Sequence, residues 1–536
     1  MKQLIFNVLS LLLLASCYED KGNYDYLDVP EIEIADFDYQ GKNLGDTIKI
    51  EPEFNVDIPK DAPYITYKWS VAGETRPDDP NWNSRNFFWI ADKLISDGWI
   101  VLELKDERLD AVYTQRTKVK VSGEFNSTFS WVILSEGEDR AAKLSFFKTL
   151  DGEYSPDYSE FYITKSKVYN DLYPSVNGNE TLGQGPISLR EHFNEGDGGD
   201  IGNYWIFTES GAVDCYGESF LKDIDMAQTF RGGLPAGAII QDGVFMKWVD
   251  VIYDQYGHIY TRIKADDELF NSDYFLQEPL SYKGEVLKQC YTVLGRYTAW
   301  GGQYALIVDK KHSRLLAVLD GESKSWDMPL ANAGEILEMP VNVADAPEGY
   351  VPLHDFSDYE IVDIKYVKIP EGWSGTPGYV ILFKEKSSGK LVLQEFSLEA
   401  DKDEMLGNFL IISNVKVHDM SGLPTIPSQM VATPNDNSQY VFFAIDKALW
   451  CYDRETQYLM HYKDFDAKIT AMEGESDFKN KHIAVGLENG EFFVLNAVRA
   501  KNQPEDKRVM SGLPEGVRLG KIVKIHYKIG SKGSWN

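Results

Sequence analysis

The sequence has little that would indicate a helical protein. No long stretch shows apolar residues at sustained i, i+3, i+4 and i+7 spacing, which argues against a helical bundle. Among the 536 residues, 31 tyrosines and 27 phenylalanines favour strands, because aromatic side chains suit a pleated, half-buried surface. We therefore expect an all-β protein.

Catalytic and metal-binding motifs are also missing. There is no His-Glu-x-x-His, no Gly-x-Ser-x-Gly and no Walker loop, so zincin, α/β-hydrolase and P-loop chemistry lose their usual support. The eight histidines are scattered without ligand spacing. With 84 acidic residues, a carboxylate pair that meets only in three dimensions stays an alternative. We expect no catalytic residue and no cofactor.

Cysteine and positive charge are scarce. Cys215, Cys290 and Cys451 are too far apart to suggest a disulfide framework or a zinc site. Cys215 and Cys451 fall in second strands of predicted hairpins, where buried free thiols are the simplest interpretation. The 84 acidic and 54 basic residues give a net charge of −30, which opposes binding to phosphate backbones. We therefore do not expect a nucleic-acid partner.

The sequence does contain one hairpin many times over. Each copy is an apolar run, a short polar turn and a second apolar run, and the turn of one copy carries Asn489-Gly490, a strong hairpin signal. The copies are residues 131–147, 204–217, 248–263, 304–320, 379–398, 440–453 and 482–496. Such a repeat predicts a radial array of sheets, and we expect a seven-bladed β-propeller over residues 128–536.

A second repeat concerns how this ring closes. Gly-Leu-Pro occurs at 233–235, 422–424 and 512–514. The first two copies precede a hairpin, whereas the third precedes a single alternating strand, residues 521–529. The first hairpin, 131–147, has no Gly-Leu-Pro before it. We predict that the C-terminal strand completes the first blade and closes the ring, which removes unpaired sheet edges.

The N-terminal residues carry a targeting signal. Lys2 precedes an apolar run from Leu4 to Ala15, too short for a membrane span of about 20 residues and typical of a secretory signal peptide, residues 1–16. The run ends Leu-Ala-Ser-Cys17, which resembles the bacterial lipobox, where the cysteine is acylated and becomes the new N-terminus. An ordinary cleavage site beside a chance cysteine is the alternative.

Residues 17–30 predict a lipidated tether. Glu19 and Asp20 follow Cys17. Acidic residues at this place resemble the signal by which lipoproteins of Bacteroidota are exported to the cell surface. A merely polar tether is the alternative.

Residues 31–127 predict an immunoglobulin-like β-sandwich. Alternating segments such as 46–54 and 116–125 are separated by turn-rich stretches. Trp69 stands where such sandwiches bury a central tryptophan.

The N-terminal third resembles a known family. The run Cys-Tyr-Glu-Asp-Lys-Gly-Asn-Tyr-Asp-Tyr (17–26), Tyr-Lys-Trp (67–69) and Trp-Val-Ile-Leu-Ser-Glu (131–136) are similar to the PKD-like lipoproteins of Bacteroidota. The resemblance implies an outer-membrane lipoprotein that faces the cell exterior and is associated with Sus-like nutrient uptake loci. It implies a TonB-dependent transporter and a capturing lipoprotein as partners. It implies no catalytic residues.

Two sets of loop residues are candidate ligand sites. Trp300 and Trp373 stand beside glycines before hairpins, where they suggest a platform for an oligosaccharide or peptide, with packing between blades as the alternative. Glu195, Asp197 and Asp200 suggest a Ca²⁺ site, with a solvated loop as the alternative.

Three functions are compatible with the sequence. The first is a non-catalytic binding protein of an uptake complex, the second a surface glycoside hydrolase or lyase with an unrecognised carboxylate pair, and the third a scaffold that binds only neighbouring proteins. A soluble ligand should bind on one face of the propeller, where loops from several blades converge.

Overall fold

The computed structural model divides the chain into two compact units, Met1–Val121 and Ser122–Asn536. It describes residues 31–125, 130–154, 156, 161–192, 202–246, 248–264, 274–293, 304–320, 332–369, 376–403, 407–432, 439–474, 482–497 and 500–528. Cys17, Glu19 and Asp20 lie outside the described residues. Within that description, no helix has the length and apolarity needed to cross a membrane.

The first unit is a small β-sandwich. Its strands are β1 (Gln40–Asn43), β2 (Thr47–Ile50), β3 (Ile65–Val71), β4 (Phe87–Ile90), β5 (Ile95–Asp106) and β6 (Ala111–Ser122). One sheet has the order β1-β6-β5-β3, and β2 pairs with β4 in the other. Trp69 of β3 is fully buried and stacks on Phe87 with ring centroids 5.0 Å apart. Its indole N–H donates to the Ser84 carbonyl, so the buried polar atom is satisfied.

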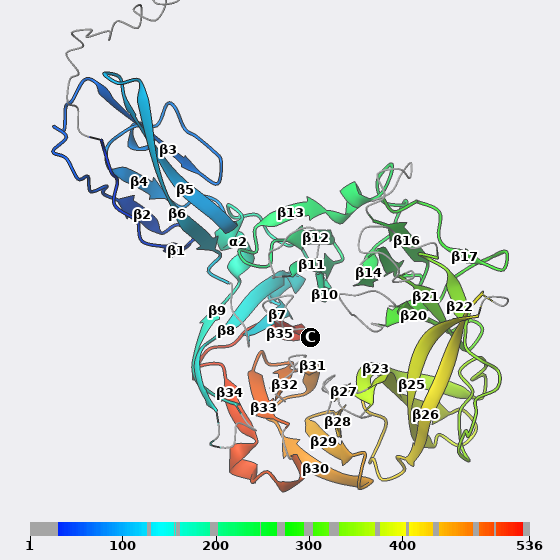
Figure 1. Ribbon diagram of the computed structural model, residues 1–536. Helices are drawn as coiled ribbons and strands as arrows, with labels where there is room; N and C mark the ends of the chain where they lie inside the picture. Colours follow the sequence, from blue (N-terminus) through cyan, green and yellow to red (C-terminus); the bar gives the residue numbers. More distant parts are fainter. Residues whose placement is uncertain are drawn as a thin grey trace, which may run out of the picture. The chain divides into compact units, whose positions relative to one another are not determined.

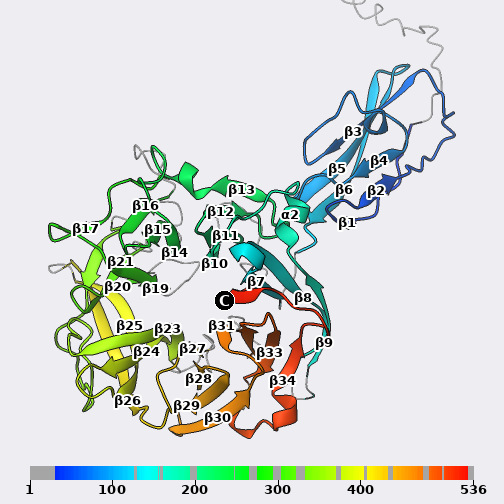
Figure 2. The same ribbon diagram turned by 180° about the vertical axis from the view of Figure 1, so that it is seen from behind.

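The second unit contains, within the described residues, seven antiparallel sheets of three or four strands. Figure 1 shows these sheets arranged around a common centre, and Figure 2 shows the same ring from behind. In order from the centre outward they are β35 (Lys521–Lys528), β7 (Ser130–Glu136), β8 (Ala142–Tyr154) and β9 (Phe161–Tyr169); β10 (Pro186–His192), β11 (Asn203–Thr208), β12 (Gly211–Cys215) and β13 (Lys222–Asp225); β14 (Ile240–Phe245), β15 (Val249–Asp254) and β16 (Ile259–Ile263); β19 (Cys290–Val293), β20 (Tyr304–Asp309), β21 (Arg314–Leu319) and β22 (Ile336–Glu338); β23 (Tyr359–Ile369), β24 (Thr376–Glu385), β25 (Leu391–Asp403) and β26 (Gly407–Asp419); β27 (Gln429–Ala432), β28 (Tyr440–Ile445), β29 (Ala448–Asp453) and β30 (Tyr458–Asp464); and β31 (Ile469–Gly474), β32 (His482–Leu487), β33 (Phe492–Asn496) and β34 (Val509–Gly512).

Short elements complete the described secondary structure. They are the two-stranded pair β17 (Ser281–Tyr282) and β18 (Glu285–Val286), the helix α2 (Leu172–Val176), and the 3₁₀ turns η1 (Pro80–Trp82), η2 (Glu138–Arg140), η3 (Met226–Thr229), η4 (Ala500–Asn502) and η5 (Glu505–Lys507).

The expectation of an all-β propeller is confirmed. Each of the seven predicted hairpins supplies the second and third strands of one sheet. These strands are covered by neighbouring sheets on both faces, so every residue of β20 and β32 is buried. This explains why the middle strands stand out in the sequence as continuous apolar runs.

The predicted ring closure is also confirmed. β35 pairs with β7, with Ile525 opposite Ile133 and Tyr527 opposite Trp131. Ile522, Ile525 and Tyr527 are each at most 1% exposed. The three Gly-Leu-Pro segments lie just before β14, β27 and β35, the innermost strands of their sheets. The C-terminal strand therefore occupies the innermost place in the first sheet.

The innermost strands all run in the same direction relative to the ring. Because the pairing is antiparallel, the start of each innermost strand lies beside the end of the second strand, as Ile240 lies opposite Asp254. One face of the propeller is therefore formed by the starts of the innermost strands and by the turns that join second to third strands. We call it the turn face.

Candidate ligand-binding site

Side chains join neighbouring innermost strands around the axis. The Arg190 guanidinium of β10 binds the Asp242 carboxylate of β14 with distances of 2.7 and 2.9 Å. Asp363 of β23 accepts a hydrogen bond from the backbone N–H of Met430 in β27 at 2.8 Å. These contacts link strands that share no backbone hydrogen bonds.

The same arrangement continues through the next three junctions. Gln429 of β27 accepts from the backbone N–H of Met472 in β31 at 3.0 Å. The Lys524 ammonium of β35 lies 3.5 Å from the Glu473 carboxylate of β31. The His526 ring of β35 lies 3.4 Å from the Glu191 carboxylate of β10. We call these five connections the inner-strand links.

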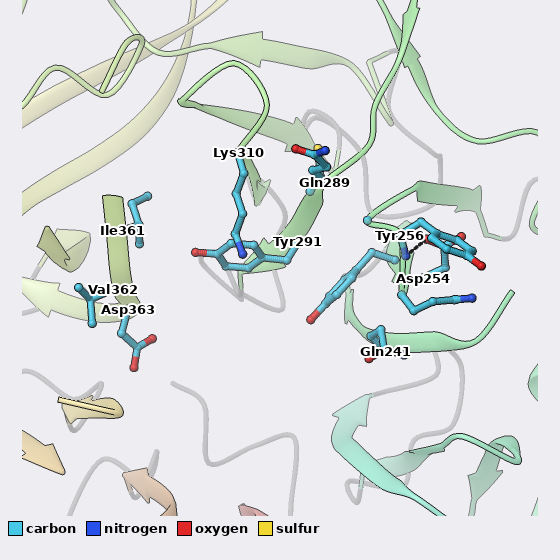
Figure 3. A pocket seen from close by; sticks show the side chains of 13 residues that line it. Gln241, Asp254, Tyr256, Gln289, Tyr291, Lys310, Ile361, Val362 and Asp363 are labelled. Atoms are coloured by element: carbon cyan, nitrogen blue, oxygen red, sulfur yellow. Dashed lines mark hydrogen bonds between the residues drawn. The ribbon is translucent and has the colours of Figure 1, made fainter. Parts of the chain in front are cut away.

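The links stop on either side of β19. Among the described residues, no side-chain hydrogen bond or ion pair joins β19 to β14 or to β23. A pocket of about 630 Å³ lies at these two junctions (Figure 3). Its volume falls within the range of roughly 300–1,000 Å³ typical of small-molecule sites.

Three neighbouring sheets supply the pocket wall. The lining residues are Gln241, Tyr253, Asp254, Gln255, Tyr256 and Gly257 of the β14 sheet, Gln289, Cys290, Tyr291 and Lys310 of the β19 sheet, and Ile361, Val362 and Asp363 of β23. They come from the starts of three innermost strands and from the turns after β15 and β20, so the pocket lies on the turn face.

Gly257 allows two of these sheets to meet. Its φ is +72°, and a Cβ there would lie 2.3 Å from the backbone nitrogen of Cys290. That nitrogen donates instead to the Gly257 carbonyl at 3.1 Å, and Gln289 N–H donates to the Tyr256 carbonyl at 3.0 Å. Only glycine fits this conformation and this approach, so the turn fixes one wall of the pocket.

Both carboxylates of the pocket are engaged with protein groups. Asp254 is 2% exposed and accepts hydrogen bonds from the backbone N–H groups of Tyr256 and His258 and from the His258 ring. Asp363 accepts from the backbone N–H groups of Ile364 and Met430. Because backbone amides hold both groups, they are poorly suited to act together as a general acid and base.

Other polar groups of the pocket are free to contact a ligand. Burial raises the pKa of Tyr253 and of Tyr291, so both hydroxyls stay protonated at neutral pH. Within the described structure, neither hydroxyl and no part of the Gln289 amide is hydrogen-bonded to protein. Gln241 donates through Nε2 to the Ile239 carbonyl, which leaves its side-chain oxygen available. The Lys310 ammonium lies 4.8 Å from the centroid of the Tyr291 ring (Figure 3).

Cys290 is in the wall but is not a nucleophile. It is 4% exposed, and burial raises the pKa of its thiol to about 12. A thiol in this state is protonated at neutral pH and unreactive. Cys215 and Cys451 are likewise buried and free, as their places in the predicted hairpins suggested.

The ligand residues predicted from the sequence lie outside the described residues. They are Trp300, Trp373, Glu195, Asp197 and Asp200. Each belongs to a segment that joins an innermost strand to the second strand of its sheet, and the flanking strand ends are at the opposite end of those strands from the pocket. Within the described ranges, no three His, Cys, Asp or Glu side chains are grouped so as to hold a metal ion.

Sequence reasoning did not find the pocket, because its lining is spread from residue 241 to residue 363. One signal was present. Gln241, Gln289 and Lys310 are polar residues at the ends of short strands on the same face, but only the paired register shows that these ends meet.

Comparison with known proteins supports the same division of the chain. Residues 17–186 match the PKD-like family, a range that covers the sandwich and the strands β7, β8 and β9. No curated protein matches the chain.

Solved structures share low identity with the chain. YCF48 from Cyanidioschyzon merolae is 11% identical, with 62% of this chain and 87% of that chain covered and a TM-score of 0.35. The Cps50 (Swd1) β-propeller domain from Myceliophteria thermophila is 11% identical, with 63% and 89% covered and a TM-score of 0.34. BBS1N, solved in complex with ARL6DN, is 14% identical, with 63% and 87% covered and a TM-score of 0.33. At these scores the similarities carry no argument about function.

Proposed function

We propose that the protein is a cell-surface lipoprotein of the outer membrane and a non-catalytic binding component of a Sus-like uptake complex. Acylated Cys17 would anchor it, and Glu19 and Asp20 would direct it to the exterior. The lipobox-like sequence and the PKD-like match, which starts at residue 17, support this proposal. Its partners would be a TonB-dependent transporter and a capturing lipoprotein, and its ligand an oligosaccharide or a peptide.

The single observation that supports a binding role is the interruption of the inner-strand links at β19. At the other five junctions, polar side chains bind one another or backbone amides. At β19 the hydroxyls of Tyr253 and Tyr291 and the ammonium of Lys310 face an open pocket instead. Free polar groups that converge with aromatic rings in a pocket are typical of a ligand site.

A surface hydrolase is the second candidate. It would need two free carboxylates beside the ligand, and in this pocket Asp254 and Asp363 are held by backbone N–H groups. A pure scaffold is the third candidate, and it would make no use of the pocket.

One screen separates these functions. The mature chain is tested for binding and turnover against pooled oligosaccharides and casein peptides, beside Tyr291→Ala and the control Lys311→Gln. We expect binding without turnover, lost in Tyr291→Ala and kept in the control, whose lysine pairs with Glu285 away from the pocket. Turnover would support the hydrolase, and no binding of any kind would support the scaffold.

Trp300→Ala and Trp373→Ala belong in the same screen. If they abolish binding while Tyr291→Ala does not, the ligand binds at the opposite end of the innermost strands. Unchanged binding in both tryptophan variants is the result that the pocket predicts.

Surface location has its own test. Proteinase added to intact cells should degrade residues 31–536, and Cys17→Ala should release the protein or leave it unprocessed. Replacing Glu19 and Asp20 by Ala should leave it facing inward. Protection on intact but not on lysed cells would contradict the outward orientation, and an unchanged surface signal in the Glu19 and Asp20 variant would make these residues a tether only.

A further inference from the structure

The free groups of the pocket have a shared chemistry. A phenol hydroxyl and a side-chain amide each donate and accept hydrogen bonds, as sugar hydroxyls do. Tyr253, Tyr291, Gln241 and Gln289 provide four such groups around one cavity. The exposed ring of Tyr256, 62% accessible, adds an apolar face at the rim. Aromatic faces beside groups that both donate and accept suit a hydroxyl-rich ring.

Lys310 adds a charge that no described carboxylate neutralises. Its neighbour Lys311 forms an ion pair with Glu285, and no such pair is formed by Lys310, whose ammonium lies over the Tyr291 ring. The carboxylates of Asp254 and Asp363 are already satisfied by backbone amides, and Lys365 lies 3.2 Å from Asp363. The group still available for an ionic contact with a ligand is therefore a cation.

A single lysine sets a limit on the charge of the ligand. The chain carries a net charge of −30, so each negative charge on a ligand is repelled at long range. One ammonium offsets one carboxylate at short range, whereas a polyanion would need a larger basic patch. A saccharide with one acidic group in the pocket satisfies both conditions.

We propose that the pocket binds a saccharide that carries a carboxylate, such as a residue of the uronic or sialic acid type. This inference rests on the proposed binding function. Lys310 contacts the carboxylate, and Tyr253, Tyr291, Gln241 and Gln289 contact hydroxyls. A peptide fits less well, because peptides are held by strand edges and apolar side-chain pockets, and the aliphatic side chains of this lining are those of Ile361 and Val362.

The test is calorimetric titration of the full mature chain with matched acidic and neutral probes. The acidic probes are trigalacturonic acid, a glucuronic-acid disaccharide and sialyllactose, and the neutral probes are galactotriose and lactose. We expect at least one acidic probe to bind more than about tenfold tighter than its neutral counterpart. This preference should weaken as salt is raised, because an ionic contact at a solvent-accessible site is screened.

Variants of two adjacent lysines make the result specific. Lys310→Gln should lower affinity for the acidic probe about tenfold, Lys310→Arg should largely keep it, and Lys311→Gln should leave it unchanged. Melting curves of all three should match the unaltered chain, since neither lysine is buried.

The opposite results separate this inference from the proposed function. If neutral probes bind as tightly as acidic ones, or if Lys310→Gln has no effect, the acidic-saccharide inference is wrong and the binding function stands. If casein peptides bind in a manner that depends on Tyr291 and no saccharide does, the ligand class is wrong. If no probe of either kind binds, both proposals fail.

Discussion

Five junctions of the inner ring are joined by side chains and two are not. On the joined arc, from β23 through β27, β31, β35 and β10 to β14, polar side chains of one strand are consumed by the next. On the open arc around β19, polar side chains of the same types face a pocket. The same position in a repeated fold can therefore serve either ring stability or ligand contact.

The difference follows from which residues stand at the strand starts. Arg190 and Asp242 neutralise each other across a junction, and Gln429 caps a backbone amide of the next strand. β19 presents Tyr291 at this place, whose hydroxyl makes no hydrogen bond within the described structure. The two arcs should respond in opposite ways to substitution, in stability on one side and in binding on the other.

The largest effect should come from removing the strand that closes the joined arc. Deletion of residues 519–536 takes away Ile522, Ile525 and Tyr527, each worth about 1.5–3 kcal/mol of burial. That sum is a large part of a typical unfolding free energy of about 5–15 kcal/mol, and the deletion leaves β7 as an open edge. We expect aggregation, measured by size-exclusion chromatography and thermal melting.

A second deletion is the control for the first. Residues 122–536 alone should stay folded, because the sandwich and the propeller have separate cores. A chain ending at residue 518 that is monomeric and melts like the intact protein would contradict closure by β35.

The next effect concerns a single link. Arg190→Leu leaves the Asp242 carboxylate, whose side chain is 13% exposed, without its charged partner. Removing one member of a largely buried pair costs about 3 kcal/mol, which urea unfolding would measure as a lower midpoint. Arg518→Leu is the control, because its pair with Glu491 is near the surface and should cost less than about 1 kcal/mol. Equal midpoints for the two variants would refute a stabilising role for this link.

The architecture could be predicted from the sequence because the middle strands carry its signal. Residues such as Val441, Phe442 and Phe443 are buried from both sides, and a run of apolar residues records that directly. The innermost strands are shorter and polar on the axis side, and β10, β14, β23, β31 and β35 contain register shifts that break alternation. Their pairing follows from the closed ring and not from local pattern, so the pocket between them could not be predicted.

Acid should weaken the joined arc through a buried carboxylate. Glu395 of β25 is 1% exposed and paired with Arg454. Burial acts to raise the pKa of Glu395, but the His418 ring and the charges of Arg454 and Lys416 outweigh it and lower the pKa from 4.5 to about 2. A carboxyl whose pKa is lower in the folded chain stabilises the fold above its unfolded pKa. That stability is lost as the pH falls from about 4.5 towards 2.

The lowered pKa of Glu395 corresponds to roughly 3 kcal/mol at neutral pH. Unfolding of the unaltered chain and of Glu395→Gln is compared at pH 7 and at pH 3. We expect the variant to be clearly less stable at pH 7 and the gap to shrink at pH 3. A gap that does not change with pH would assign the loss to packing and not to the charge.

The smallest effect gives the sharpest comparison, because one substitution can be made on both arcs. Gln429 of β27 and Gln241 of β14 are half-buried glutamines at the starts of innermost strands. Gln429→Ala removes the acceptor for the Met472 N–H, and an unsatisfied buried donor costs about 1–3 kcal/mol. Gln241→Ala removes only a local bond to the Ile239 carbonyl, so it should cost less than about 1 kcal/mol while lowering the affinity for a saccharide bound in the pocket. If Gln241→Ala proves the more destabilising of the two, or if Gln429→Ala is the one that loses binding, then the open arc is part of the frame and the two arcs do not divide stability from recognition.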